Sequence, residues 1–135
     1  MLIAGILVLV ASFYQHKYFK KLLFNISVML FGLGLVAIGI FPGNIRPYHG
    51  MASMLTFISG GFCAIMSTKI VSLPFKYISA LFGSIALLTF FIAVFKSGWL
   101  ISFIGIGGIE RWVDYPIMLW VTGFGGYLMS NRNMV

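Results

Sequence analysis

Apolar residues fill five long runs along the chain, and the polar and charged residues gather in the short stretches between them. A helix of about 20 apolar residues is long enough to cross a bilayer. The runs therefore predict an all-α fold, a polytopic transmembrane helical bundle with about five membrane helices. The predicted helices lie at about residues 1–19, 20–41, 50–70, 75–95 and 112–130, within a single integral membrane domain that covers residues 1–135.

The first run is the weakest membrane span. It is strongly apolar only from Met1 to about Tyr14, ahead of His16 and Lys17. Such a helix reaches about 21 Å, which is less than a hydrocarbon core of about 30 Å. We therefore expect that this helix holds His16 and Lys17 at the headgroups, or that it has lost a partner helix upstream.

The composition identifies lipid as the solvent of this chain. Its 135 residues are 61% hydrophobic and 8% charged, whereas a soluble domain is about one-quarter charged. The net charge of +7 would suggest nucleic-acid binding in a soluble protein. Here the basic residues lie mostly at the ends of apolar runs, where they orient helices and contact lipid headgroups. We expect a multi-pass protein of the cell membrane, with the lipid bilayer as a partner and no nucleic acid.

The distribution of basic residues predicts the orientation, because cytoplasmic loops are enriched in Lys and Arg. Three basic residues, Arg46, Lys96 and Arg111, belong to one side of the predicted bundle. Six belong to the other side, namely Lys17, Lys20, Lys21, Lys69, Lys76 and Arg132. We therefore expect the N-terminus outside and the C-terminus inside.

The side predicted to face outward holds the polar residues that could form a ligand site. The candidate ligand-binding residues are Arg46, His49, Glu110, Arg111 and Asp114. Glu110 and Asp114 are the only acidic residues, and their i, i+4 spacing puts both carboxylates on one face of a helix. An ionisable group near a membrane usually has a partner. Two interpretations remain, a surface ion pair between Glu110 and Arg46 or Arg111, and a pocket for a headgroup or a proton-linked ligand.

The stretch FPGNIRPYHG, residues 41–50, predicts a chain reversal between the second and third helices. Pro42 ends one helix, Gly43 and Asn44 form the turn, and Pro47 directs the next helix. His49 begins that helix. The pattern leaves open whether His49 also binds a ligand.

The sequence predicts no cofactor, no metal and no catalytic residue. His16 and His49 lie at opposite membrane faces, about 30 Å apart, so the two cannot ligate one haem. A zinc site needs at least three ligands, which only His49, Glu110 and Asp114 could supply. Ser53 follows His49 by one helical turn, but such a pairing of nucleophile and base is common by chance.

Small residues mark the places where helices can approach closely, because in lipid the association depends on van der Waals contact. Cys63, the only cysteine, lies in an apolar run and is expected to be a small buried residue. Pro116 is expected in the first turn of the fifth helix, where its missing N–H costs nothing. The glycines expected to pack helices are Gly32, Gly34, Gly39, Gly60, Gly61, Gly83, Gly123, Gly125 and Gly126.

Two stretches carry a family resemblance. VAIGIFPGNIRPYHGMASMLTFISGG joins two apolar helices through a short polar loop, and GIGGIERWVDYPIMLWVTGFGGYLM leads through Glu-Arg and Tyr-Pro into a last helix. Together they resemble the bacterial and archaeal membrane family catalogued as domain of unknown function 998. The matching positions are Gly39, Phe41, Pro42, His49, Gly50, Glu110, Arg111, Tyr115 and Pro116.

The resemblance covers the chain from about Leu22 onward and implies a six-helix fold with a polar extracytoplasmic face. It also implies that the family's first helix is absent here, so that the short first helix aligns with the family's second. It implies no reaction.

Three functions are compatible with these features. The first is an accessory or scaffolding subunit that packs against other membrane subunits or associates with itself. The second is a binding or transport-like component with an extracytoplasmic pocket for a lipid headgroup, a quinone or another small amphiphile. The third is a membrane-embedded hydrolase.

Overall fold

The computed structural model describes residues 1–95 and 97–130. These residues form helices and no strand, which confirms the all-α class. The five predicted helices are present, and α1 to α4 are long and apolar enough to cross a membrane. The helices are α1 (Leu2–Phe19), α2 (Leu22–Ile40), α3 (Arg46–Ser67), α4 (Phe75–Phe95) and α5 (Ser97–Ser130).

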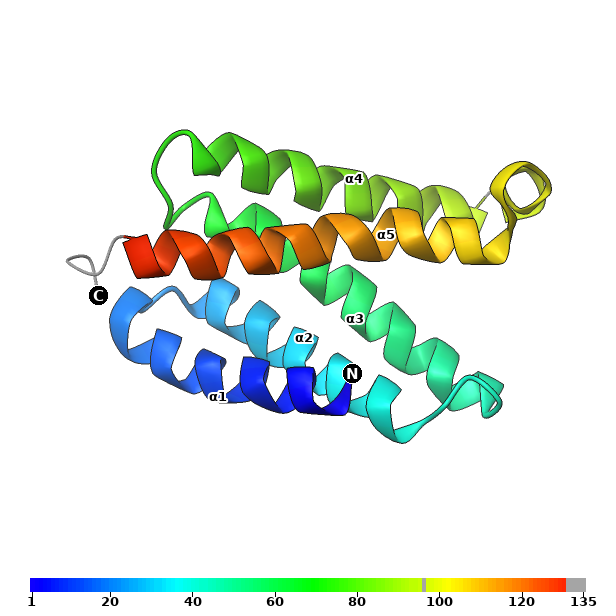
Figure 1. Ribbon diagram of the computed structural model, residues 1–135, viewed down its shortest axis with the longest axis horizontal. Coiled ribbons are helices and arrows are strands. Elements are labelled where there is room, and N and C mark those ends of the chain that lie inside the picture. The colour runs from blue at the N-terminus through cyan, green and yellow to red at the C-terminus, as the bar shows by residue number, and fades with distance from the viewer. Residues whose placement is uncertain (96, 131–135) are drawn as a thin grey trace.

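Consecutive helices run in opposite directions and pack side by side (Figure 1). α3 is central, since it packs against α2, α4 and α5. The connections alternate between the two ends of the bundle (Figure 1). We call the end that holds Lys20, Lys21, Lys69 and Lys76 the lysine end, and the opposite end, where α3 starts, the His49 end.

α3 starts earlier than the hydropathy pattern predicted. It begins at Arg46 rather than near residue 50, and it ends at Ser67 rather than near residue 70. Pro47 lies in its first turn, where a proline needs no N–H partner. His49 therefore lies at the end of the first turn of α3 instead of beginning the helix.

The prediction for the start of the last helix was wrong. α5 begins at Ser97 and is broken at Gly105, whose φ of 71° and ψ of 167° are not helical. Pro116 lies inside the helix instead of in its first turn, and its ring removes the backbone bond to the carbonyl four residues earlier. Glu110, Arg111 and Asp114 lower the local hydropathy without breaking the helix, since Glu and Arg are good helix formers.

The part of α5 before Gly105 lies across the His49 end of the bundle, where Figure 1 shows it end on. The rings of Trp99 and Phe103 stack there, with centroids 6.1 Å apart, and both side chains are exposed. Aromatic rings of this kind favour the headgroup level of a membrane.

Glycines set the distances between the helices, as predicted for Gly34 and Gly83. The same prediction was wrong for Gly125 and Gly126, since an added Cβ there would meet no atom within 4 Å. A Cβ atom on Gly34 would collide with the Thr56 hydroxyl and lie 2.9 Å from the Thr56 backbone nitrogen. A Cβ atom on Gly83 would lie 2.8 Å from the Gly61 carbonyl oxygen. Gly5 on α1 is equally close to α2, at 2.6 Å from the Val36 nitrogen.

A buried tryptophan joins the second half of the bundle. The Trp120 indole Nε1 of α5 donates to the hydroxyls of Ser67, at the end of α3, and Ser79 on α4, both at 3.2 Å. Both serines are fully buried. Cys63 is also fully buried, as expected of a small core residue.

We expect Gly34→Ala to destabilise the bundle, because α2 and α3 would have to separate. Overpacking of this kind costs about 1–3 kcal/mol, so the unfolding midpoint of the protein in detergent should fall by about 5 °C or more. Gly126→Ala is the matched control, since no atom lies within 4 Å of its added Cβ. Equal midpoints for the two variants would show that the close contact at Gly34 does not limit stability.

Candidate functional site

A pocket of about 330 Å³ opens at the His49 end between α2, α3 and α5. Four of the five predicted binding residues line it, and Arg46, the exposed first residue of α3, does not. We call this cavity the polar pocket. Its lining residues are Met1, Leu35, Ile38, His49, Ser53, Thr56, Phe57, Gly107, Glu110, Arg111 and Asp114.

His49 is held in place by the loop before α3. Its ring Nδ1 lies 2.8 Å from the Phe41 carbonyl oxygen. A carbonyl can only accept, so Nδ1 is the donor in this contact, and in a neutral ring Nε2 would then be an acceptor. The Phe41 ring in turn stacks on Tyr48, with centroids 5.3 Å apart. The FPGNIRPYHG stretch therefore reverses the chain and also orients a pocket side chain.

The charged residues of the pocket come from one face of α5. Gly107, Glu110, Arg111 and Asp114 follow one another at helical spacing, and all four line the cavity. Glu110 and Arg111 are exposed, and Asp114 is partly buried. No ion pair joins Glu110 to Arg46 or Arg111 among the described residues. The carboxylates and the guanidinium therefore face the same cavity without contacting each other directly.

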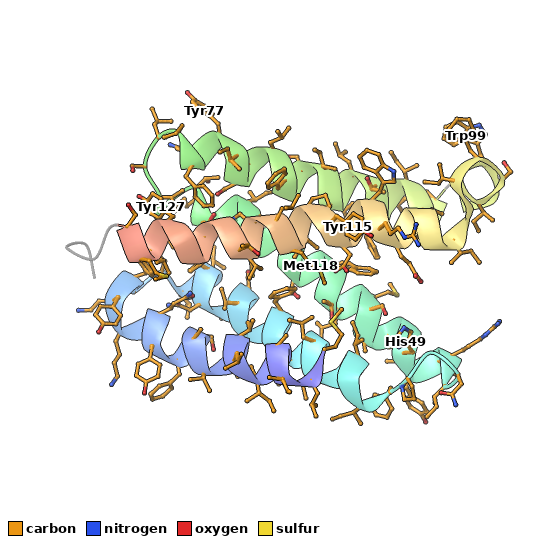
Figure 2. All side chains as sticks on the ribbon, in the orientation of Figure 1. His49, Tyr77, Trp99, Tyr115, Met118 and Tyr127 are labelled. Carbon is orange, nitrogen blue, oxygen red and sulfur yellow. The ribbon has the colours of Figure 1, made fainter. Side chains whose placement is uncertain are left out.

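A second cavity, which the sequence did not predict, lies between α4 and α5. It measures about 490 Å³ and is almost entirely apolar. We call it the α4–α5 groove; it is lined by Phe82, Ile85, Gly108, Arg111, Trp112, Tyr115, Pro116 and Leu119. Figure 2 labels Tyr115 on α5, one of these lining residues. In the sequence, the helical spacing of Gly108, Trp112 and Tyr115 could have indicated the face of α5 that lines this groove.

Arg111 lines both cavities. Its long side chain stands between a polar space and an apolar one, which suits the amphipathic character of arginine. Gly107 lines the polar pocket and Gly108 the groove, and neither has a side chain that would separate the two spaces.

The residues considered as metal ligands, His49, Glu110 and Asp114, and the candidate nucleophile Ser53 all line the polar pocket. In the described residues, no group of three His, Cys, Asp or Glu side chains could hold a metal ion. Thus His49, Glu110 and Asp114 share a cavity but do not converge on one point. His49 and Ser53 both line the pocket, yet no hydrogen bond joins them in this part of the chain.

Comparison with known proteins gives the family. Residues 1–127 match the family described as "Protein of unknown function (DUF998)". The chain belongs to the DUF998 family. The match includes α1, whereas the sequence pattern located the resemblance only from about Leu22 onward. No curated protein and no solved structure matches the chain.

In this DUF998 protein, five of the nine positions that carry the resemblance line the two cavities. Phe41 binds the His49 ring, Glu110 and Arg111 line the polar pocket, and Tyr115 and Pro116 line the groove. Residues far apart in the sequence are thus brought together at one end of the bundle.

Proposed function

We propose that this DUF998 protein binds a small amphiphile at its His49 end, with the polar head in the polar pocket and the apolar tail in the α4–α5 groove. One observation carries the proposal, namely that Arg111 lines both cavities. A ligand that passes this side chain changes from polar to apolar surroundings within one helical turn of α5.

The charges in the pocket favour a head that carries both signs. Glu110 and Asp114 suit an ammonium group, and the Arg111 guanidinium suits a phosphate oxygen, which it binds through paired hydrogen bonds. A lipid with a phosphoethanolamine headgroup has both groups. A quinone, which would accept hydrogen bonds from Arg111, is the uncharged alternative within the same class of ligand.

The polar head of the ligand must provide most of the binding selectivity. A lipid tail that enters the groove leaves other lipid tails rather than water, so its transfer gains little free energy. The polar head exchanges water and headgroup contacts for charged side chains in a cavity, and hydrogen bonds to charged groups are worth about 1.5–3 kcal/mol each.

We expect Arg111→Gln to weaken binding of a short-chain phosphatidylethanolamine about tenfold or more, since it removes a charged donor worth at least about 1.4 kcal/mol. Titration calorimetry of the detergent-purified protein would measure the dissociation constant. Arg46→Gln is the matched control, because it removes the same charge at the same end but lies outside the pocket. If both variants bind as the wild type does, or lose affinity equally, the pocket is not the binding site.

A second candidate function is that of an accessory or scaffolding subunit, and α1 favours it. Only 11% of the α1 span is buried inside the bundle, against 39% for α2 and 44% for α3. The exposed α1 residues Ile3, Leu7 and Val10 form an apolar stripe at helical spacing. Another membrane subunit or a second copy of the chain could cover this stripe.

Native mass spectrometry of the protein extracted gently from its own membrane tests that second candidate. An accessory subunit should appear with other subunits in a fixed ratio, and replacing Leu7 with a bulkier Trp should reduce that co-purification. A single chain that carries one bound lipid would contradict the scaffolding function and support the amphiphile.

The proposed site implies a location and an orientation. The protein would lie in the cell membrane with its N-terminus outside and its C-terminus inside, so that the polar pocket opens to the extracytoplasmic side. The grouping of Lys20, Lys21, Lys69 and Lys76 at the lysine end supports this orientation.

Cysteine labelling tests the orientation. We expect Asn44→Cys, at the His49 end, to react with a membrane-impermeant maleimide in intact cells. Ser72→Cys, in the α3–α4 turn, should react only after the cells are permeabilised. The wild-type chain gives the background, since its Cys63 is fully buried. The reverse labelling pattern would place the polar pocket on the cytoplasmic side.

A further inference from the structure

A third cavity lies at the lysine end, opposite the polar pocket. It measures about 260 Å³ and is lined by residues from the start of α2 and the end of α3. We call it the lysine cavity; its lining residues are Lys21, Leu22, Leu23, Phe24, Met66 and Lys69. The two lysines come from separate connections, α1–α2 and α3–α4, and the fold brings them to one cavity.

The chain has no side-chain carboxylate to neutralise this cavity. Its only acidic residues, Glu110 and Asp114, line the polar pocket at the other end of the bundle. Lys21 and Lys69 both line this small cavity with exposed side chains. Their like charges repel each other, and the repulsion is stronger near lipid than in water. An anion from outside the chain would relieve that repulsion.

The backbone adds to the positive potential. Lys21 is the N-cap of α2, and no side chain caps the helix there. The N–H groups of the first helical turn have no acceptor within the helix, and the helix dipole adds a partial positive charge. Leu22, Leu23 and Phe24, which form this turn, are lining residues of the cavity. The lysines and the helix end therefore act in the same direction.

The apolar surface next to the lysines favours a lipid over a free ion. Leu22 and Leu23 are 65% and 64% exposed, and Phe24 is buried at 1%. An acyl chain could lie along the two leucines while its headgroup reached Lys21 and Lys69. We infer that the lysine cavity binds the phosphate headgroup of an anionic phospholipid, whose acyl chains lie against Leu22 and Leu23.

This site is independent of the proposed amphiphile site. It lies at the opposite end of the bundle and shares no lining residue with the polar pocket or the groove. Its charge is of one sign, whereas the polar pocket carries both. A negative binding result at one site therefore does not count against the proposal for the other site.

Lipid titration followed by native mass spectrometry tests the inference, with the detergent-purified full chain. The probes are phosphatidylglycerol, which is anionic, and phosphatidylcholine, which is not. The wild type should prefer phosphatidylglycerol by about tenfold to thirtyfold, as expected for two lysines at a membrane surface. The double variant Lys21→Gln/Lys69→Gln should reduce that preference to about twofold or less.

The control is Lys17→Gln/Lys76→Gln, which removes the same charge at the same end without touching the cavity. Lys17 lies over the Phe13 ring, 5.6 Å from its centroid, and Lys76 is in the first turn of α4. This control should keep the preference of the wild type. An equal loss in both double variants would indicate diffuse surface charge and overturn the site, as would an unchanged preference in Lys21→Gln/Lys69→Gln.

Two further measurements complete the test. Inorganic phosphate at millimolar concentration should not displace the lipid; displacement would assign the cavity to free phosphate instead. If the double variant does not fold, the charge-preserving Lys21→Arg/Lys69→Arg variant replaces it. That variant should keep the preference for phosphatidylglycerol. Because added ions screen exposed charges, 0.5 M salt should reduce the preference. A preference that salt leaves unchanged would contradict the electrostatic site.

Discussion

The close approach of helix backbones at glycine is the contact on which this structure depends. In lipid, helices gain little from burying apolar side chains, so their association relies on close van der Waals contact. Gly34 provides that contact between α2 and α3, and its neighbour Leu35 and its partner Thr56 both line the polar pocket. The close spacing of α2 and α3 at Gly34 is thus also the spacing of the two helices that form one wall of the polar pocket. Because of this link, changes in packing at Gly34 would also change the shape of the candidate site.

Trp120 positions α5, which forms the other wall of the polar pocket. It ties α5 to α3 and α4 through Ser67 and Ser79, and so fixes the rotation of α5 about its axis. The buried stripe of α5 runs through Phe124, Trp120 and Ile117. Asp114 and Glu110 lie on the same face of α5, about one and two helical turns closer to the His49 end. The face of α5 that is apolar in the core is therefore the face that becomes polar at the pocket.

The sequence predicted the parts of the fold that depend on hydropathy and spacing. The helix count, the all-α class and the common placement of His49, Glu110, Arg111 and Asp114 follow from the apolar runs and the i, i+4 rule. The start of α5 did not follow, because hydropathy reports how a residue interacts with lipid and not whether its backbone is helical. The break at Gly105 lies in an apolar stretch where hydropathy gives no such signal, and only the three glycines among residues 105–108 favour it.

Other parts of the site depend on how helices are placed in space, which one helix's sequence does not contain. The α4–α5 groove exists because Phe82 on α4 and Trp112 on α5 leave space between them, and single-helix patterns could suggest only that Trp112 lies near an interface. Arg46 was grouped with the pocket residues by charge and side of the membrane. Since α3 begins at Arg46, that side chain lies one turn beyond His49, outside the cavity.

The lysine end of the bundle is basic and the His49 end carries charges of both signs, and this difference links the predicted orientation to the two proposed lipid sites. Anionic lipids are concentrated in the cytoplasmic leaflet, which is also the side that Lys-rich loops favour. Lys21 and Lys69 therefore contribute to both arguments, since they predict which end faces inward and they line the cavity there. A cavity with only positive charge would meet its anionic ligands in that leaflet, while a pocket of mixed charge would face the opposite one. Under the two proposals, orientation and ligand chemistry would thus both follow from the same few charged positions in an otherwise apolar chain.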